Sequence, residues 1–327
     1  MASDPLPRTL VPMKATSGDL PRGEGWGYEV KWDGMRALVF VDRGSIRVQS
    51  YNERDVTASW PELADLAEAL PVTTALLDGE IVATDDQGRP SFGRLQQRMH
   101  LTKAAEVAVR AAEVPVTYVV FDLLHLDGHD LMPLPLLDRR RLLDEVLEPG
   151  SCWQRSPVHD DGQALLDAAT AQGLEGVVAK RLDSAYEPGK RVRTWLKVKV
   201  RPQQELVVGG WLPGEGNRSG RIGALLVGYH DRAGDGGPLR FAGRVGTGFT
   251  DAELRRLEGL LAPLATDVCP FDPPPPRAEL RRGPRWVRPE LVAELAFGEW
   301  TSDGRLRHPS YLGMRDDKDA ADVTREP

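Results

Sequence analysis

The stretch Tyr28-Glu-Val-Lys-Trp-Asp-Gly-Met-Arg36 decides how the rest of the chain is interpreted. If it is a strand that runs into a glycine turn, Glu29, Lys31 and Asp33 share one face, because successive side chains of a strand alternate between faces. A lysine between two carboxylates, directly before a turn, is typical of a side chain that its neighbours hold in a fixed position. The alternative is a solvated row of ion pairs at a sheet edge, and this stretch alone does not exclude it.

Four segments further along the chain combine strand-like apolar residues with polar or aromatic side chains that an active site could use. They are Leu76-Leu-Asp-Gly-Glu-Ile-Val82, Tyr118-Val-Val-Phe-Asp-Leu-Leu124, Leu174-Glu-Gly-Val-Val-Ala-Lys180 and Trp195-Leu-Lys-Val-Lys199. Each segment by itself has a plain structural interpretation, as a core strand or as an exposed face. Their succession in one chain is the informative feature, because each would otherwise be a separate coincidence.

The length and the pattern of apolar residues predict two domains, residues 1–201 and 202–327. In the first, short strands and helices alternate in an α+β arrangement with largely antiparallel sheets. The expected strands are 37–41, 75–82, 116–124, 176–180 and 194–200, and the expected helices are 60–70 and 138–147. In the second, three closely spaced strands and one helix are typical of a small β-barrel. These strands are expected at 206–211, 223–229 and 239–245, and the helix at 251–261.

Composition excludes several classes of protein. The two cysteines, Cys152 and Cys269, are far apart in sequence, which argues against a disulfide scaffold and against a cysteine zinc site. No stretch approaches the roughly 18 apolar residues of a membrane span, so we expect a cytoplasmic protein without a membrane partner.

The net charge of −7 argues at first against a polyanionic partner. However, the charges are segregated along the chain. Residues 55–86 contain eight acidic and no basic side chains, whereas residues 180–201 contain eight basic and two acidic ones. A second basic run comprises Arg277, Arg281, Arg282, Arg285 and Arg288. Binding to nucleic acid depends on the facing patch and not on the total, so we expect an acidic outer surface and a basic nucleic-acid-binding cleft.

Taken in order, the five segments resemble the motifs of the covalent nucleotidyltransferase superfamily, above all those of ATP-dependent DNA ligases. The stretch 299–318 resembles the last motif of these ligases. The resemblance implies a nucleotidyltransferase (ATP-grasp-like adenylation) domain of antiparallel sheets with flanking helices, followed by an all-β OB-fold domain. Within the family, the chain is most similar to the compact bacterial type represented by ligase C and by the ligase module of ligase D.

This resemblance implies a three-step reaction. Lys31 attacks the α-phosphate of ATP, releases pyrophosphate and holds AMP as a phosphoramidate. AMP then passes to the 5′-phosphate of a nick in duplex DNA, and the adjacent 3′-hydroxyl displaces AMP and seals the strand. ATP is expected as the cofactor in preference to NAD, because NAD-dependent ligases resemble one another in having an additional N-terminal domain and a four-cysteine zinc module. Only 30 residues precede Lys31 here, and the chain has two cysteines.

The same resemblance assigns nucleotide contacts to ten residues: Glu29, Val30, Arg36, Arg54, Glu80, Phe121, Glu175, Lys197, Lys199 and Arg315. It implies that Glu29 and the backbone of Val30 lie at the adenine edge, that Phe121 stacks on adenine and that Glu80 reaches the ribose. Arg36 is expected on the nucleotide or on the nick phosphate. The family's next motif corresponds to Ser50-Tyr-Asn-Glu-Arg54. Many relatives have an arginine directly after the serine of this motif, whereas this chain has Tyr51. Arg54 is the alternative phosphate ligand.

Two charge arguments complete the predicted site. Lysine with its ordinary pKa of about 10.4 is protonated at neutral pH, so Lys31 needs an environment that favours the neutral amine, and Lys197 and Lys199 are the candidate cations. Glu80 and Glu175 would repel a polyphosphate unless a divalent cation intervenes, and hard carboxylate oxygens with phosphate suit Mg²⁺ or Mn²⁺.

The expected partner is nicked duplex DNA, with a Ku-like end-binding protein or another repair protein as a possible recruiter, and the expected oligomeric state is a monomer. DNA repair is therefore the expected role. The nearest alternatives are an RNA ligase and a capping-type nucleotidyltransferase. An alternative from another class is a non-catalytic OB-type nucleic-acid-binding protein with a relic catalytic domain. The polar residues of the motifs are all intact, which argues against this alternative.

Overall fold

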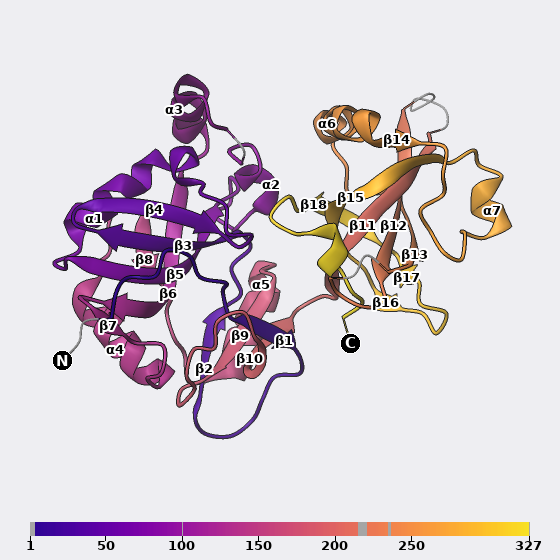
Figure 1. The fold of residues 1–327 in the computed structure, drawn as a ribbon. Helices are drawn as coiled ribbons and strands as arrows, with labels where there is room; N and C mark the ends of the chain where they lie inside the picture. Colours follow the sequence, from indigo (N-terminus) through magenta and orange to yellow (C-terminus); the bar gives the residue numbers. More distant parts are fainter. Residues whose placement is uncertain (1–3, 100, 215–220, 235–236, 327) are drawn as a thin grey trace. The chain divides into compact units, whose positions relative to one another are not determined.

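The computed structural model describes residues 4–99, 101–214, 221–234 and 237–326. The chain divides into two compact units, Met1–Val200 and Arg201–Pro327. In Figure 1 the first unit runs from indigo to pink and the second from pink-orange to yellow.

The first unit is built on two sheets. Its strands are β1 (Lys14–Ser17), β2 (Trp26–Val30), β3 (Met35–Asp42), β4 (Ser45–Ser50), β5 (Thr74–Ala83), β6 (Val116–Leu126), β7 (His129–Asp130), β8 (Trp153–Arg155), β9 (Gly176–Arg181) and β10 (Arg191–Lys199). The larger sheet has the order β4-β3-β5-β6-β7, with β8 beside β6, and the other has the order β1-β10-β9-β2. The pairs β1·β10 and β6·β8 are parallel and the other neighbours are antiparallel.

Helices and short turns surround these sheets. They are η1 (Thr57–Ser59), η2 (Pro61–Asp65), α1 (Leu66–Ala69), α2 (Phe92–Leu95), α3 (Ala104–Glu113), α4 (Leu136–Val146) and α5 (Gly162–Gln172). The expected helix at 60–70 is wrong in type for its first half, because η2 is a 3₁₀ turn and only α1 is α-helical. Trp60, Leu63 and Leu66 are fully or almost fully buried. Their spacing of three suits a 3₁₀ turn, in which residues i and i+3 lie above one another.

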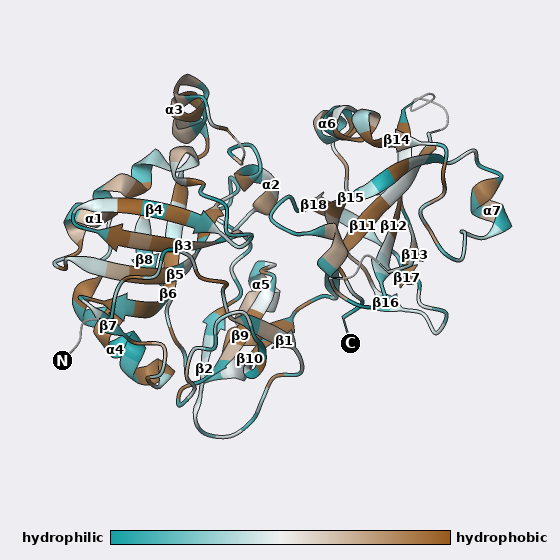
Figure 2. Cartoon of the chain, in the orientation of Figure 1, coloured by the Kyte–Doolittle hydropathy of each residue, from teal (hydrophilic) through white to brown (hydrophobic). Residues whose placement is uncertain are grey.

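The larger sheet is covered on both faces, which explains why residues 37–41 of β3 are all apolar. Met35, Ala37, Val39 and Val41 belong to one buried cluster, and the intervening Leu38 and Phe40 belong to another. This alternation follows from the two-residue period of a strand. On the face of Leu38 and Phe40, the sheet also carries Leu76, Phe121 and Leu124, and the other members of that cluster include Met13, Tyr186 and Trp195. Figure 2 shows the apolar colouring of the β3 strand.

The second unit is mainly β-structure. Its elements are β11 (Gln203–Pro213), β12 (Ile222–His230), β13 (Leu239–Val245), α6 (Asp251–Leu261), η4 (Ala262–Leu264), β14 (Ala265–Thr266), α7 (Arg277–Leu280), β15 (Arg285–Ala296), β16 (Glu299–Trp300), β17 (Leu306–Arg307), β18 (Ser310–Met314) and η5 (Ala320–Asp322). The sheet order is β13-β12-β11-β15-β14, with β18 beside β15.

Helix α6 buries Leu254, Leu257 and Leu261 in the cluster that contains Leu206 and Val208 of β11. This spacing of three and four places the leucines on one helical stripe. The structure is consistent with an OB fold, although the second unit also has the short helix α7.

The fold class predicted from the sequence is confirmed as α+β with largely antiparallel sheets in the first unit and a β-rich second unit. Within the part of the chain that the structure describes, no helix is long and apolar enough to cross a membrane.

Candidate active site

Lys31 lies in the loop that leaves β2. The strand ends at Val30, and the backbone N–H of Lys31 donates to the carbonyl of Gly176 at 2.9 Å. Three residues later the chain passes so close to β5 that a Cβ on Gly34 would overlap the carbonyl oxygen of Ile81. Glycine at this position is therefore a steric requirement of the loop that holds Lys31.

Lys31 pairs with a carboxylate from outside its own stretch of sequence. Its Nζ lies 2.5 Å from Oε2 of Glu175, whose side chain is 5% exposed. Glu29 instead pairs with Lys180, and Asp33 accepts a hydrogen bond from the backbone N–H of Phe92 at 3.1 Å. The expected shared face for Glu29, Lys31 and Asp33 stays a prediction, because β2 ends at Val30 and strand alternation is not established beyond it.

Glu175 precedes β9 at a point where two strands approach closely. A Cβ on Gly176 would overlap the carbonyl oxygen of Val198, so only glycine fits between Glu175 and the rest of β9. In the same register Lys199 is opposite Gly176, and Lys197 is opposite Val178. The two lysines are two residues apart on β10 and share one face. Lys31, Glu175 and Lys199 therefore come from adjoining backbone positions at one end of this sheet.

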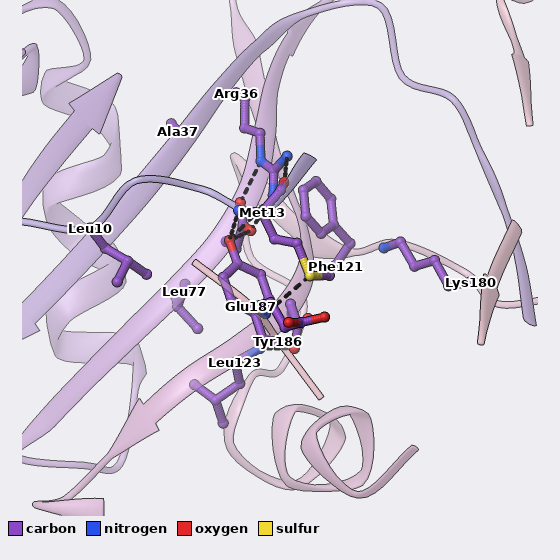
Figure 3. Close-up of polar contacts among 12 residues, drawn as sticks. Leu10, Met13, Arg36, Ala37, Leu77, Phe121, Leu123, Lys180, Tyr186 and Glu187 are labelled. Atoms are coloured by element: carbon purple, nitrogen blue, oxygen red, sulfur yellow. Dashed lines mark hydrogen bonds and ion pairs between the residues drawn. The ribbon is translucent and has the colours of Figure 1, made fainter. Parts of the chain in front are cut away.

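Arg36 and Asp78 form a densely bonded polar group of the first unit, and Figure 3 shows the hydrogen bonds of the Arg36 side chain as dashed lines. Asp78 is fully buried and accepts from Nε and Nη2 of Arg36 at 2.9 and 2.6 Å and from the hydroxyl of Tyr186 at 2.7 Å. Arg36 also donates to the carbonyl of Met13 at 2.7 Å, and the N–H of Met13 donates to the hydroxyl of Tyr186 at 3.0 Å. Although burial alone would lower the pKa of Arg36, Asp78 raises it above its ordinary value.

This geometry bears on the role predicted for Arg36. Three of its nitrogen atoms are engaged by the protein, so the guanidinium is positioned by Asp78 and Met13 and is not directed to an open site. Glu80 is directly opposite Arg36 in the register of β3 and β5. The side chains of Arg36 and Glu80 therefore lie on the same face of the sheet as the Leu38 and Phe40 cluster.

Phe121 and Lys180 lie together on this face, and Figure 3 shows Lys180 pointing toward the Phe121 ring. The Lys180 Nζ lies 4.2 Å from the centroid of that ring, 4.4 Å from the centroid of Trp195 and 2.7 Å from Oε1 of Glu29. The side chains of Glu29 and Lys180 are each 4% exposed. Burial lowers the pKa of Lys180 below its ordinary value, although the charge of Glu29 opposes this shift.

The remaining predicted ligands lie elsewhere. Arg54 is exposed in the turn after β4, and Lys14 places its Nζ 5.3 Å from the ring centroid of Tyr51 in the same turn. Arg315 belongs to the second unit, where its guanidinium is held by Glu294 at 2.7 Å and by Asp317 at 2.8 Å. Its side chain is 11% exposed, so in this structure Arg315 is a buried partner of two carboxylates.

Two observations concern whether this region could bind a divalent cation. Oε1 of Glu175 is buried and has no hydrogen-bond partner, so one carboxylate oxygen beside Lys31 still lacks a ligand. Among the described residues, no group of three or more His, Cys, Asp or Glu side chains could hold a metal ion by itself. The residues therefore fit a Mg²⁺ ion that takes one or two carboxylates and completes its shell with phosphate oxygens and water, which is how this ion usually binds in nucleotide sites.

Sequence reasoning missed three residues of this region: Lys180, Tyr186 and Trp195. Lys180 directly follows the apolar run Gly-Val-Val-Ala of β9 (Gly176–Arg181), and a lysine at such a position is a signal of a buried charge with a partner. Tyr186 and Trp195 bear no such signal, because aromatic residues are ordinary members of a core.

Two family models match the chain. The model described as ATP dependent DNA ligase domain matches residues 12–199. The model described as ATP dependent DNA ligase C terminal region matches residues 218–318.

Known proteins are similar over nearly the whole chain. The chain is 41% identical to the "Multifunctional non-homologous end joining protein LigD" of Mycolicibacterium smegmatis, over 98% of this chain and 40% of the relative. It is 44% identical to the "Multifunctional non-homologous end joining DNA repair protein LigD" of Mycobacterium tuberculosis strain H37Rv, over 97% of this chain and 40% of the relative. The chain thus spans about two fifths of the length of these relatives.

A solved structure described as mycobacterial DNA ligase D complexed with ATP and MES is 40% identical in sequence. It covers 97% of this chain, this chain covers 98% of it, and the TM-score is 0.69. The predicted resemblance is therefore confirmed by sequence and by fold.

Proposed function

Because this chain belongs to the ATP-dependent DNA ligase family, we propose that it seals nicks in duplex DNA through a lysine–AMP intermediate on Lys31 and that it serves DNA repair. The proposal rests on the contact between Lys31 and Glu175, which brings together residues of two separate motifs. The relatives described as non-homologous end joining proteins support the repair role.

In the first step the Nζ of Lys31 forms a bond to the α-phosphorus of ATP, and the bond from that phosphorus to the pyrophosphate oxygen breaks. The amine must lose its protons for this attack. Oε2 of Glu175 lies at hydrogen-bond distance and is the acceptor that this geometry offers. While the carboxylate is charged and nothing else binds it, the pair favours the ammonium form, so the nucleophile is held in place before it is released.

Recognition of adenine is assigned to Glu29 and the backbone of Val30. A carboxylate accepts hydrogen bonds only, so Glu29 suits the amino group of adenine and disfavours the carbonyl oxygen that guanine has at the same position. Lys180 holds Glu29 in place from the neighbouring strand. Phe121 supplies the apolar surface for the base and Glu80 the acceptor for the ribose.

Lys197 and Lys199 are proposed to neutralise phosphate charge and to stabilise the oxygens of the departing pyrophosphate. Mg²⁺, or Mn²⁺, bound by Glu175 and Glu80 together with phosphate oxygens, would neutralise the carboxylate that holds the Lys31 ammonium and would polarise the phosphate. Domain 1–201 is thus proposed to catalyse adenylation, and domain 202–327 is proposed to complete the binding of DNA. Arg54 remains the proposed ligand of a DNA phosphate, because it is exposed.

Arg315 is proposed to act on the nucleotide only when its pairs with Glu294 and Asp317 open. The protein is proposed to work as a cytoplasmic monomer, with nicked duplex DNA as substrate and with recruitment by a Ku-like end-binding protein or another repair protein.

Sealing of a labelled nick by the purified chain tests this function. We expect product from a nicked DNA duplex with ATP and Mg²⁺, little product with GTP or NAD in place of ATP, and less product from the equivalent RNA duplex. Removal of divalent cation with a chelator should stop the reaction. Sealing with GTP as efficient as with ATP, or sealing of RNA in preference to DNA, would overturn the proposal in favour of the capping or RNA-ligase alternative.

A further inference from the structure

A buried arginine of the first unit connects two parts of the candidate active site. Arg140 belongs to α4, which packs against β6 (Figure 1), and it is 7% exposed. Its neighbour Arg139 pairs with the buried carboxylate of Asp122 at 2.7 Å. Arg140, in contrast, forms no ion pair with any residue that the structure describes. A buried guanidinium that no carboxylate neutralises is costly, so its position requires an explanation.

The hydrogen bonds of Arg140 go to two backbone carbonyls. Nη1 donates to the carbonyl of Phe121 at 3.0 Å, and Nη2 donates to the carbonyl of Ser156 at 2.5 Å. Its Nε is buried and has no acceptor among the described residues. The planar fork of a guanidinium holds two acceptors at a fixed separation, whereas an ammonium on a flexible stem does not. Arg140 therefore fixes the backbone at Phe121 relative to the backbone at Ser156.

Ser156 connects Arg140 to the loop of the proposed nucleophile. Ser156 is fully buried, and its N–H donates to the carbonyl of Val120 at 2.7 Å. Its hydroxyl accepts from Nε1 of Trp32, the residue directly after Lys31, at 3.2 Å. The N–H, the carbonyl and the hydroxyl oxygen of Ser156 thus bind β6, α4 and the Lys31 loop. A residue held at three points cannot move toward one partner without straining its bonds to the others.

The residues that follow Ser156 contact the strand that precedes Lys31. We name residues 156–159 the bridging segment. At its end, His159 exchanges two backbone hydrogen bonds of 2.8 Å with Tyr28 of β2. The bridging segment therefore binds the chain three residues before Lys31 as well as directly after it. Its position determines where the loop can place the Lys31 amine.

We propose that Arg140 is a positioning residue for the reaction of Lys31 with ATP. It fixes the backbone of Phe121, which is proposed to contact the base, and through the bridging segment it fixes the loop of the nucleophile. This inference rests on the proposed function. Phosphoryl transfer depends mainly on alignment, and a misplacement of about 1 Å can slow a reaction by about a hundredfold. A single guanidinium that holds the base-binding surface and the nucleophile loop at a fixed separation supplies this alignment.

The test measures single-turnover formation of the lysine–AMP adduct by the full chain with labelled ATP and Mg²⁺. The variants are Arg140→Met, Arg140→Lys, Ser156→Ala and Trp32→Phe. The matched control Arg141→Met removes the next arginine of α4, whose side chain is 67% exposed. Thermal unfolding shows which variants are folded. Ser156→Ala and Trp32→Phe keep Arg140 and remove only the contact with the Lys31 loop, so they test the proposal even where Arg140→Met does not fold.

Arg140→Met should raise the KM for ATP and should lower the adenylation rate at saturating ATP by about tenfold. Ser156→Ala and Trp32→Phe should lower this rate without a change in KM, because the contacts proposed for the base remain. The double variant of these two should be no slower than either single variant, since both break the same hydrogen bond. Arg140→Lys should recover only part of the loss, because an ammonium does not reproduce the fork. Arg141→Met should match the unmodified chain.

Sealing of a nick whose 5′ end already bears AMP distinguishes positioning of Lys31 from a general loss of structure. The Lys31 amine is not the nucleophile in this step, so Ser156→Ala should retain most of this activity. Equal adenylation rates in Arg140→Met, Ser156→Ala and the control would overturn the proposal. Equal losses of adenylation and of this sealing step in Ser156→Ala would also overturn it. An unmodified chain that forms no lysine–AMP adduct would instead overturn the proposed function.

Discussion

At the scale of single residues, the buried pair of Glu29 and Lys180 shows how charge is arranged in the candidate active site. Each side chain is nearly inaccessible, and the lysine is further enclosed by the rings of Phe121 and Trp195. Removing two charges from water is costly, and only their mutual attraction offsets this cost. Such a pair contributes little to stability as a whole, but neither member can be removed alone.

Lys180→Met should therefore destabilise the protein by about 3–5 kcal/mol, because it leaves the carboxylate of Glu29 buried without its partner. The double variant Glu29→Gln/Lys180→Met should recover much of this loss, since no uncompensated charge remains. Urea unfolding of the first unit measures both values. A single variant as stable as the unmodified chain would contradict the pairing seen here.

Much of the candidate site could be proposed only through the resemblance of ordered motifs to a known family, and these assignments stay predictions. Lys31, Glu80, Phe121, Glu175 and Lys199 belong to ordered motifs, and such motifs are local in sequence. The partner of each side chain could not be predicted. Glu175 reaches Lys31 only because Gly176 allows the close approach of β9 and β10, and Glu29 turns to a lysine that is far along the chain. Pairing across strands is a property of register, which the motif itself does not encode.

At the scale of elements, the segment before β2 is fastened to the candidate site through Tyr186. The N–H and carbonyl of Met13 bind the hydroxyl of Tyr186 and the guanidinium of Arg36, and the hydroxyl also donates to Asp78. Burial raises the pKa of Tyr186 well above its ordinary value, so the hydroxyl keeps the proton that it donates. One phenol thus joins the N-terminal segment, β3 and β5.

Tyr186→Phe should cost about 1–3 kcal/mol, because a buried N–H and a buried carboxylate each lose a hydrogen bond while the ring still fills its place. We also expect proteolysis in the segment 4–17 to become faster, since the N–H of Met13 loses its hydrogen-bond acceptor. Thermal unfolding and limited proteolysis measure these effects, with Tyr51→Phe as the matched control. Unchanged stability and unchanged cleavage would show that the hydroxyl does not hold the segment.

The C-terminal motif of the second unit depends on the pair of Arg315 and Asp317. Burial alone would raise the pKa of Asp317, but the guanidinium of Arg315 lowers it below the ordinary value of 3.8. A carboxylate with a lowered pKa in the folded state stabilises the protein above its unfolded pKa, and this stabilisation disappears as the pH falls through the folded pKa.

Asp317→Asn should therefore be less stable than the unmodified chain by about 2 kcal/mol at neutral pH. The difference should stay constant down to pH values near 3.8 and should shrink below them, because the carboxylate of the unfolded state then binds a proton while the native carboxylate, with its lowered pKa, does not. Denaturant unfolding of both proteins as a function of pH measures the difference. A difference that stays constant to about pH 2 would contradict the lowered pKa.

At the scale of the whole molecule, each of the two units has its own buried clusters, and the charges are segregated between segments. Apolar spacing predicted β3, β5, β6, β9–β13 and the helix α6, because these elements bury whole faces. It did not predict the twelve-residue strand β15, in which Arg288, Pro289 and Glu290 interrupt the apolar pattern. It also did not predict η2, α7 or the strand β1, because short elements are determined by their tertiary neighbours. The total charge of −7 is compatible with a DNA-binding surface only because the basic side chains are concentrated in a few places.

The central claim is that Lys31 is the nucleophile that accepts AMP, and one measurement tests it most directly. The chain is incubated with α-labelled ATP and Mg²⁺, and the protein-bound label is counted after denaturation and after acid treatment. The unmodified chain and Lys103→Ala, which removes a lysine that is 79% exposed, should both carry an acid-labile label. Lys31→Ala should carry none. Label retained at the normal level on folded Lys31→Ala would contradict the claim.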